Sequence, residues 1–318
     1  MWRWIFPSVL TALALACGPN LKWEIYTTDD GLGGNEVRDL FVDSQGRIWA
    51  STWGGSVGGA SVFVGESWTL FTVEEGLAHK NVNAVFVDSE GSSWFATERG
   101  LSVFDGIEWT THTEEDGLAD DIVLSVTVAP NGVVWAGTTE GLSVFDGSGW
   151  TTYTEEDGLA GNTVRAVVTD SKGNLWAGSG SDDGGLSVFD GSGWRVYKTE
   201  QGLVSNNVRG ITLGSDDSLW IATLAGASFF DGETFTNYTV GDGLANDFVL
   251  RIALDAQGRT WFGTARGLTI LNEGKLKTYL LKEGPLEHEL TAIAIDPEDR
   301  KWVGTRRGGV RMLEAGKP

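Results

Sequence analysis

Short apolar stretches separated by glycine- and aspartate-rich turns fill almost the whole chain, and the same order of stretches occurs seven times. Each copy has four pieces in which apolar and polar residues alternate, and this alternation is typical of half-buried strands. The seven copies begin at Trp23, Trp68, Trp109, Trp150, Trp194, Phe235 and Leu276. Four strands in each repeat of about 40 to 45 residues predict a β-propeller, whose blades pack around a central channel.

The phase of the repeat predicts how the ring closes. In the first complete blade the four strands are expected, from the centre outward, at Val37 to Asp43, around Trp49, near Ser61 to Val64 and from Trp68. The chain therefore starts with an outer strand, Trp23 to Thr28. It ends with three inner strands, near Leu290 to Ile295, Lys301 to Thr305 and Val310 to Leu313. We predict an all-β, seven-bladed propeller of four-stranded antiparallel blades over residues 22–318. Residues 22–28 should pair with residues 309–314, which removes open sheet edges.

Two turn motifs separate the predicted strands. Asp-Gly pairs such as Asp105-Gly106 place a glycine where tight hairpins require a positive φ. The second motif, Asp-x-x-Gly-x-x-Trp, loses its Asp, its Gly or both in three copies but keeps its tryptophan in all seven: Trp49, Trp94, Trp135, Trp176, Trp220, Trp261 and Trp302. Burial of one tryptophan side chain is worth at most roughly 4 to 6 kcal/mol. We therefore expect one tryptophan to anchor each blade.

One repeat carries a recognisable signature. It contains Tyr153-Thr154, Asp157-Gly158-Leu159, Asn162, Val164, Asp170, Gly173, Trp176 and Gly185-Leu186. This series resembles the bacterial two-component-regulator propeller repeat, and the likeness extends from Trp23 to about Leu313. The resemblance implies the propeller fold. In that family the propeller is usually the periplasmic sensor part of a hybrid histidine kinase, followed by an immunoglobulin-like domain, a membrane helix and kinase modules. None of these follows here, so the resemblance implies a free-standing propeller, and the fold alone does not transfer a ligand.

Charge and the N-terminal segment indicate where the protein acts. The formal net charge of -21 disfavours nucleic acids and acidic membrane surfaces as partners, because phosphate binding needs clustered cations. Residues 1–16 combine Arg3 with an apolar stretch too short to span a bilayer, which predicts a signal peptide. Cys17, the single cysteine, follows Ala14-Leu15-Ala16 as in bacterial lipoproteins, and residues 17–21 form a short linker. We expect lipidation of Cys17 and a periplasmic, outer-membrane or cell-surface location, with ordinary cleavage as the alternative.

Catalytic machinery is not evident in the sequence. The three histidines are His79, His112 and His288. His112 takes the place of a recurrent tyrosine, which indicates packing, while His79 and His288 belong to blades that are not adjacent. Because a metal site needs three or four converging ligands, we expect neither a metal nor a cofactor. The Gly-x-Ser-x-Gly stretch at Gly54–Gly58 falls in a predicted loop rather than in the strand-to-helix turn that hydrolases use.

Residues that do not recur between the repeats are the best candidates for a binding site. Several arginines follow the first valine of the innermost strands, near the predicted channel mouth, where they could donate to a carboxylate or sugar hydroxyls or form ion pairs between blades. Trp53 stands beside a glycine-rich insertion and could stack on a sugar ring or a partner surface. Asn or Asp two residues before that valine could bind a ligand or stabilise a turn. The full candidate set is Asn35, Arg38, Trp53, Asn162, Arg165, Asn206, Arg209, Asp247, Arg251 and His288.

These observations favour an exported, sensor-like binding module over an enzyme. The ligand would be a glycan, a small molecule or a protein, held at the face that carries the connections into the innermost strands, and we expect a monomer. A propeller-fold lyase or other hydrolytic enzyme is the alternative, and a structural or adhesive surface scaffold is a third possibility.

Overall fold

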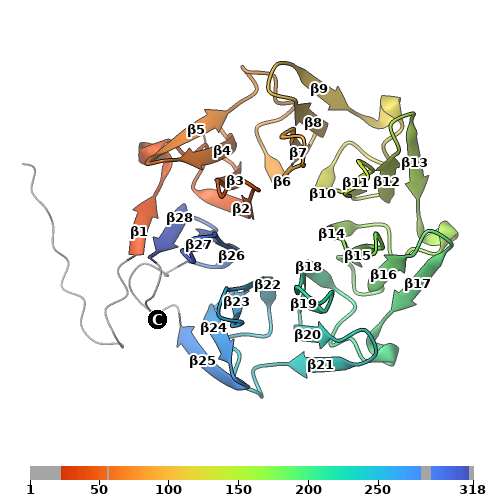
Figure 1. Cartoon of the computed structure of the whole chain (residues 1–318), viewed down its shortest axis with the longest axis vertical. Coiled ribbons are helices and arrows are strands. Elements are labelled where there is room, and N and C mark those ends of the chain that lie inside the picture. Colours follow the sequence, from red (N-terminus) through yellow and green to blue (C-terminus); the bar gives the residue numbers. More distant parts are fainter. Residues whose placement is uncertain (1–22, 56, 281–287, 315–318) are drawn as a thin grey trace, which may run out of the picture.

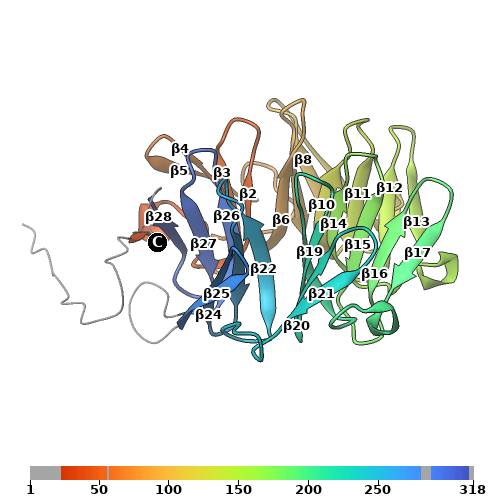
Figure 2. The same ribbon diagram turned by 60° about the horizontal axis from the view of Figure 1, so that its bottom comes forward.

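The computed structural model describes residues 23–280, except residue 56, and residues 288–314. The expected signal peptide (1–16), linker (17–21) and Cys17 lie outside the described residues. In the described part, seven four-stranded antiparallel sheets stand around a common axis (Figure 1). Their strands run between the two faces of the ring (Figure 2). The predicted seven-bladed propeller is therefore confirmed.

Each blade has the same order of strands from the axis outward. The innermost strands, in blades one to seven, are β2 (Glu36–Val42), β6 (Val82–Val87), β10 (Val123–Val128), β14 (Val164–Thr169), β18 (Val208–Leu213), β22 (Val249–Leu254) and β26 (Leu290–Ile295). The second strands are β3 (Ile48–Trp53), β7 (Ser93–Thr97), β11 (Val134–Thr138), β15 (Leu175–Ser179), β19 (Leu219–Thr223), β23 (Thr260–Thr264) and β27 (Lys301–Thr305).

The outer half of each blade is equally regular. The third strands are β4 (Gly59–Val64), β8 (Gly100–Phe104), β12 (Leu142–Phe145), β16 (Leu186–Phe189), β20 (Gly226–Phe230), β24 (Gly267–Asn272) and β28 (Val310–Leu313). The outermost strands are β5 (Ser67–Phe71), β9 (Trp109–His112), β13 (Trp150–Tyr153), β17 (Trp194–Tyr197), β21 (Phe235–Tyr238), β25 (Lys275–Leu280) and β1 (Trp23–Tyr26). Short 3₁₀ turns lie on four of the connections between blades: η1 (Thr28–Asp30), η2 (Glu114–Asp116), η3 (Glu155–Asp157) and η4 (Thr199–Gln201).

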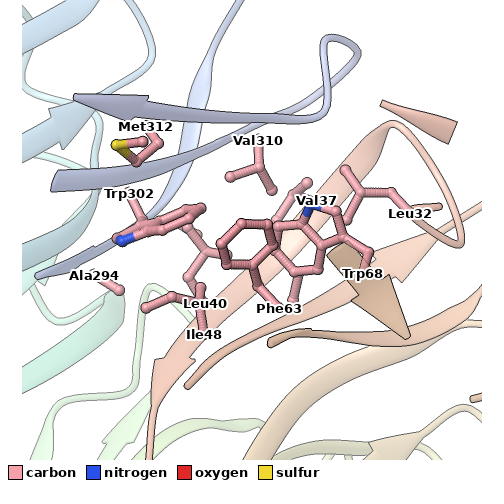
Figure 3. Close-up of a cluster of buried hydrophobic side chains, with 12 residues drawn as sticks. Leu32, Val37, Leu40, Ile48, Phe63, Trp68, Ala294, Trp302, Val310 and Met312 are labelled. Carbon is pink, nitrogen blue, oxygen red and sulfur yellow. The ribbon is translucent and has the colours of Figure 1, made fainter. Parts of the chain in front are cut away.

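The two ends of the described chain meet in blade seven. β1 pairs antiparallel with β28, with Trp23 opposite Leu313 and Tyr26 opposite Val310. A hydrophobic cluster joins this blade to blade one and contains the fully buried Trp302 together with Phe63 and Trp68 (Figure 3). The predicted closure by the N-terminal strand is confirmed, and aromatic packing between the first and last blades supports it.

The predicted innermost strand of blade one is displaced by one residue, because Asp43 belongs to the turn after β2. The Asp43 carboxylate accepts hydrogen bonds from the backbone N–H groups of Gln45 and Arg47 and from the Trp49 indole N–H, at 2.9 to 3.0 Å. The aspartate therefore fixes the hairpin and orients the tryptophan that follows it. All seven repeated tryptophans are buried, as the repeat predicts.

Candidate functional site

A β-bulge lies near the start of every innermost strand. In blade one the register with β3 shifts between Val37 and Asp39, so Arg38 is the additional residue. Because a bulge gives one residue no partner, it changes the direction of that residue's side chain. The seven bulge residues, in blades one to seven, are Arg38, Asn83, Leu124, Arg165, Arg209, Leu250 and Thr291.

These seven residues line a single cavity at the mouth of the channel, which we call the arginine pocket. Its volume is about 350 Å³, and its other lining residues are Phe248, Arg251, Glu289 and Arg306. It lies where the innermost strands begin, on the face that carries the connections between blades. This volume is sufficient for a small organic molecule.

The charge of the arginine pocket is opposite to that of the protein as a whole. Five arginines and one glutamate line it, whereas the chain carries a formal net charge of -21. Burial and the neighbouring guanidinium groups of Arg165, Arg251 and Arg38 lower the pKa of Arg209 to about 10. Burial also lowers the pKa values of Arg38 and Arg165. A bound anion would offset this mutual repulsion.

Three of the five arginines have carboxylate partners. Nη1 of Arg38 is 3.3 Å from Oε1 of Glu36, and Arg306 forms an ion pair with Glu289. Nε of Arg251 is 3.6 Å from Oδ1 of Asp39, and its Nη1 donates to the carbonyl of Arg209 at 2.8 Å. Ion pairing between and within blades, one of the two sequence-based interpretations, therefore accounts for these three side chains.

Arg165 and Arg209 differ from the other three. Within the residues described, no carboxylate or carbonyl oxygen accepts a hydrogen bond from either guanidinium, and the Nε atom of each is buried without a partner. The Arg165 side chain extends past Gly180, where a Cβ would stand only 2.2 Å from its Cδ. The Arg209 guanidinium lies 5.9 Å from the centre of the Phe248 ring. Two adjacent blades thus present donors without acceptors.

Trp53 supports the pocket from beside it and is not one of its lining residues. The guanidinium of Arg38 lies 4.0 Å from the centre of the indole, and the indole N–H donates to Oδ1 of Asn83 at 3.1 Å. The Asn83 amide in turn donates to the carbonyl of Val123 at 2.7 Å. This series of contacts fixes Arg38, so one face of the predicted stacking platform is already occupied.

Four predicted site residues have roles in turns instead of lying in the pocket. A side-chain oxygen of each accepts a hydrogen bond from the backbone N–H seven residues earlier, at the start of the preceding 3₁₀ helix or turn, at 2.6 to 3.0 Å. These residues are Asn35, Asn162, Asn206 and Asp247. Short polar side chains recur at this position because the connection between blades needs an acceptor there.

The histidines do not form a common site. His288 packs against Gly308 in blade seven, where a glycine Cβ would stand 2.6 Å from its Cδ2, and it does not line the pocket. His112 packs on Phe145 and Trp150, and burial lowers its pKa. His79 lies 3.7 Å from Glu98. Among the described residues, no three His, Cys, Asp or Glu side chains converge as metal ligands.

Sequence reasoning missed Arg306, Glu289 and Phe248 as pocket residues. Arg306 follows β27 directly, at the place that Trp53 and Gly180 occupy in blades one and four. The repeats also differ strongly at this position, so the comparison that selected the arginines of the innermost strands could have selected Arg306. Glu289 and Phe248 precede innermost strands, where no pattern distinguishes them from turn residues.

Comparison with known families agrees with the sequence motif. The two component regulator propeller model matches residues 31–54, 158–181 and 243–266. The chain therefore contains repeats of this family, as its sequence predicts. The sequence matches none of the curated proteins with which it was compared. No helix in the described part of the chain is long and apolar enough to cross a bilayer.

Solved structures with the same fold include binding domains and enzymes. One is the extracellular domain of a proposed hybrid two component system from B. thetaiotaomicron, with a TM-score of 0.76 and 22% identity over 94% of this chain. The chain spans 42% of the length of that protein. Catalytically inactive virginiamycin B lyase from Staphylococcus aureus with quinupristin has a TM-score of 0.74 and 17% identity, over 93% of this chain and 99% of the lyase. YCF48 bound to D1 peptide has a TM-score of 0.67 and 15% identity, over 95% of this chain and 99% of YCF48.

Proposed function

We propose that this chain, built from two-component-regulator propeller repeats, is an exported binding module that holds a small organic anion in the arginine pocket. The observation that carries the proposal is the pair of guanidinium groups on adjacent blades, Arg165 and Arg209: each has a buried Nε atom without a hydrogen-bond partner, and neither forms an ion pair among the described residues. An anion placed between them would accept charge-assisted hydrogen bonds, which are among the strongest in proteins.

The scaffold suits binding because the pocket is rigid before a ligand arrives. The lining residues stand at or next to the starts of the innermost strands of a closed ring, except Arg306, which follows β27, and Trp53 and Asn83 fix Arg38. Preorganised donors lower the entropic cost of binding. A lyase activity has less support, because no histidine lines the pocket and no metal ligands converge in the described part of the chain.

Calorimetric titration with small anions tests this function. Citrate, gluconate and phosphate would be compared with neutral glucose at constant ionic strength, and we expect at least one anion to bind. Arg165→Gln and Arg209→Gln should each weaken that binding about tenfold or more, because each removes a charge-assisted hydrogen bond. Arg195→Gln on the exposed outer strand β17 is the matched control and should leave the affinity unchanged. Failure of all three anions to bind, or equal binding by the Arg165→Gln, Arg209→Gln double variant, would contradict the proposal.

Export and anchoring form the second part of the proposal. The apolar segment before Cys17 and the extracellular origin of the similar two-component domain support them. We expect the wild-type protein in the membrane fraction, held there by its lipid anchor. We expect Cys17→Ser in the soluble fraction, because this variant lacks the thiol to which the lipid would be attached. Recovery of Cys17→Ser in the membrane fraction would exclude the lipid anchor.

A further inference from the structure

The arginine pocket has two walls that face each other across the channel. In a ring of seven blades, blade one stands opposite blades four and five, as β2, β14 and β18 do in Figure 1. Blades one and seven contribute Arg38 and Arg306, whereas blades four and five contribute Arg165 and Arg209. The fifth arginine, Arg251, comes from blade six between the two walls, where it donates to the carbonyl of Arg209 and its Nε lies 3.6 Å from Oδ1 of Asp39. A ligand that fills the mouth therefore contacts arginines on both walls.

The two walls differ in net charge. On the wall of blades one and seven, Glu36 lies 3.3 Å from Arg38 and Glu289 is paired with Arg306, so two positive charges are balanced by two negative ones. On the wall of blades four and five, the described residues provide no ion pair for Arg165 or Arg209. One wall is close to neutral, whereas the other carries two positive charges without an ion pair, although the carboxylate of Asp182 acts on Arg209 and opposes the lowering of its pKa.

Each wall suits a different chemical group. Two adjacent guanidinium groups match one carboxylate, which can accept several N–H donors at once. The balanced wall presents donors from arginine together with acceptors from the glutamates that are paired with them. Hydroxyl groups both donate and accept, so they match such a wall. A second carboxylate would meet Glu289, which lines the pocket, and the negative charge of Glu36, which is paired with Arg38 but is not a lining residue. The remaining sides carry Asn83 and Leu124 on one side and Phe248, Leu250 and Arg251 on the other, and their apolar side chains can contact carbon atoms.

The outer border of the same face limits the size of an anion. The turns that lead from the outermost strands to the next blade expose many carboxylates, whereas in the described part of these connections the only lysines or arginines are Lys80 and Lys198. The exposed acidic residues in these connections are Asp29, Asp30, Glu74, Glu75, Glu114, Glu115, Asp116, Glu155, Glu156, Asp157, Glu200 and Asp242. A polyanionic chain that reached the central arginines would have to cross this negative border.

We propose that the ligand is a small hydroxylated monocarboxylate of the sugar-acid class. Its carboxylate binds between Arg165 and Arg209, and its hydroxyl groups lie against the paired Arg38–Glu36 and Arg306–Glu289. This inference rests on the proposed anion-binding function and specifies both the class and the orientation of the ligand.

Four six-carbon probes test the assignment on the wild-type protein by calorimetry. Gluconate has one carboxylate and several hydroxyls, glucarate has a carboxylate at each end, sorbitol has hydroxyls alone, and hexanoate has a carboxylate without hydroxyls. We expect gluconate to bind at least tenfold more tightly than sorbitol or hexanoate, and more tightly than glucarate. Tighter binding of glucarate or hexanoate, or no binding of gluconate, would overturn the sugar-acid assignment.

A charge change on the balanced wall gives an independent test. The double variant Glu36→Gln, Glu289→Gln leaves Arg38 and Arg306 uncompensated, so glucarate should gain affinity and become the preferred ligand. Both glutamates are partly exposed, and an unchanged melting temperature would verify folding. An unchanged order of affinities would overturn the proposed orientation.

The outcomes separate this inference from the proposed function. If another anion binds and the binding depends on Arg165 and Arg209, the proposed anion-binding function is supported and the sugar-acid assignment is wrong. If sorbitol binds as tightly as gluconate and the two arginine variants have no effect, both the anion-binding function and the sugar-acid assignment are wrong.

Discussion

At the scale of single residues, the most frequent device in this protein is an aspartate that orients a tryptophan. In five blades the carboxylate accepts the indole N–H of the tryptophan six residues later, at 2.7 to 3.1 Å. Blades three and five lack this aspartate, yet Trp135 and Trp220 are buried to the same degree as the others. Burial of the indole is therefore the requirement in every blade, and the hydrogen bond is an addition to it.

The contribution of this hydrogen bond to stability depends on pH and can therefore be measured, as we illustrate for Asp255 in blade six. Burial raises the pKa of its carboxyl group, but hydrogen bonds from Trp261 and from the backbone and side chain of Arg259 outweigh burial and hold the pKa below its usual value. A depressed pKa in the folded state adds stability above the unfolded-state value of about 4, and this stability disappears as the pH falls through the folded-state pKa.

Asp255→Asn tests this coupling. We expect the variant to lose about 1 to 3 kcal/mol of unfolding free energy at pH 7, because hydrogen bonds to a charged acceptor are lost. The loss should be smaller at pH 3, because the carboxyl group is then largely protonated in the unfolded state and part of the stabilisation of the folded state has disappeared. Urea unfolding at both pH values measures the difference, and Glu233→Gln in an exposed hairpin serves as the control. An equal loss at both pH values would show that the charge of Asp255 does not stabilise the fold.

At the scale of elements, the bulge in each innermost strand links the fold to the pocket. The residue before each bulge, a valine in six blades and Leu290 in blade seven, is fully buried in the core, while the next residue lines the channel mouth. One inserted residue thus allows a strand to keep its packing while the adjacent position varies freely. This arrangement explains why the repeats agree at the valine and differ at the residue after it.

Gly180 tests how closely the second strand controls an arginine. Its backbone conformation permits alanine, but the added Cβ would stand 2.2 Å from Cδ of Arg165 and would displace that side chain. We expect Gly180→Ala to weaken anion binding about tenfold, the loss typical of one charge-assisted hydrogen bond, with a small change in melting temperature. Gly149→Ala is the matched control, because a Cβ at that exposed hairpin glycine meets no atom within 4 Å. Wild-type affinity in Gly180→Ala would mean that the position of Arg165 does not matter for binding.

The parts of this structure that could be predicted from the sequence are those that the repeats share, namely the strands, the turns between them and the order of the strands in each blade. Alternation and turn residues placed the strands of blade one to within two residues, and the phase of the repeat placed the pairing of β1 with β28. The bulge could not be predicted because it is a property of the register between two strands. The pairing of arginines with Glu36 and Glu289 also escaped prediction, since it depends on side-chain directions that the bulge sets.

At the scale of the whole molecule, negative and positive side chains lie at different distances from the axis of the ring. Carboxylates are exposed in the turns at the outer border of one face, such as Glu115 and Glu156, while arginines gather near the axis of the same face. The large negative net charge of the chain therefore coexists with a positively charged centre. If the proposed function is correct, the central arginines select the charge of the ligand and the acidic border selects its length.

The pairing of β1 with β28 also has a consequence for the order of assembly. The strand that contains Trp23 is synthesised before any blade, yet its partner strand, which contains Val310, is synthesised after all the others. Contacts so distant in sequence carry a high entropic cost and form late in folding. Blades one to six can associate in sequence as they are made, but the ring remains an open arc until the last strands arrive. The first of the described strands to be synthesised thus lacks its native partner until the last strand is made, and its docking completes the native state.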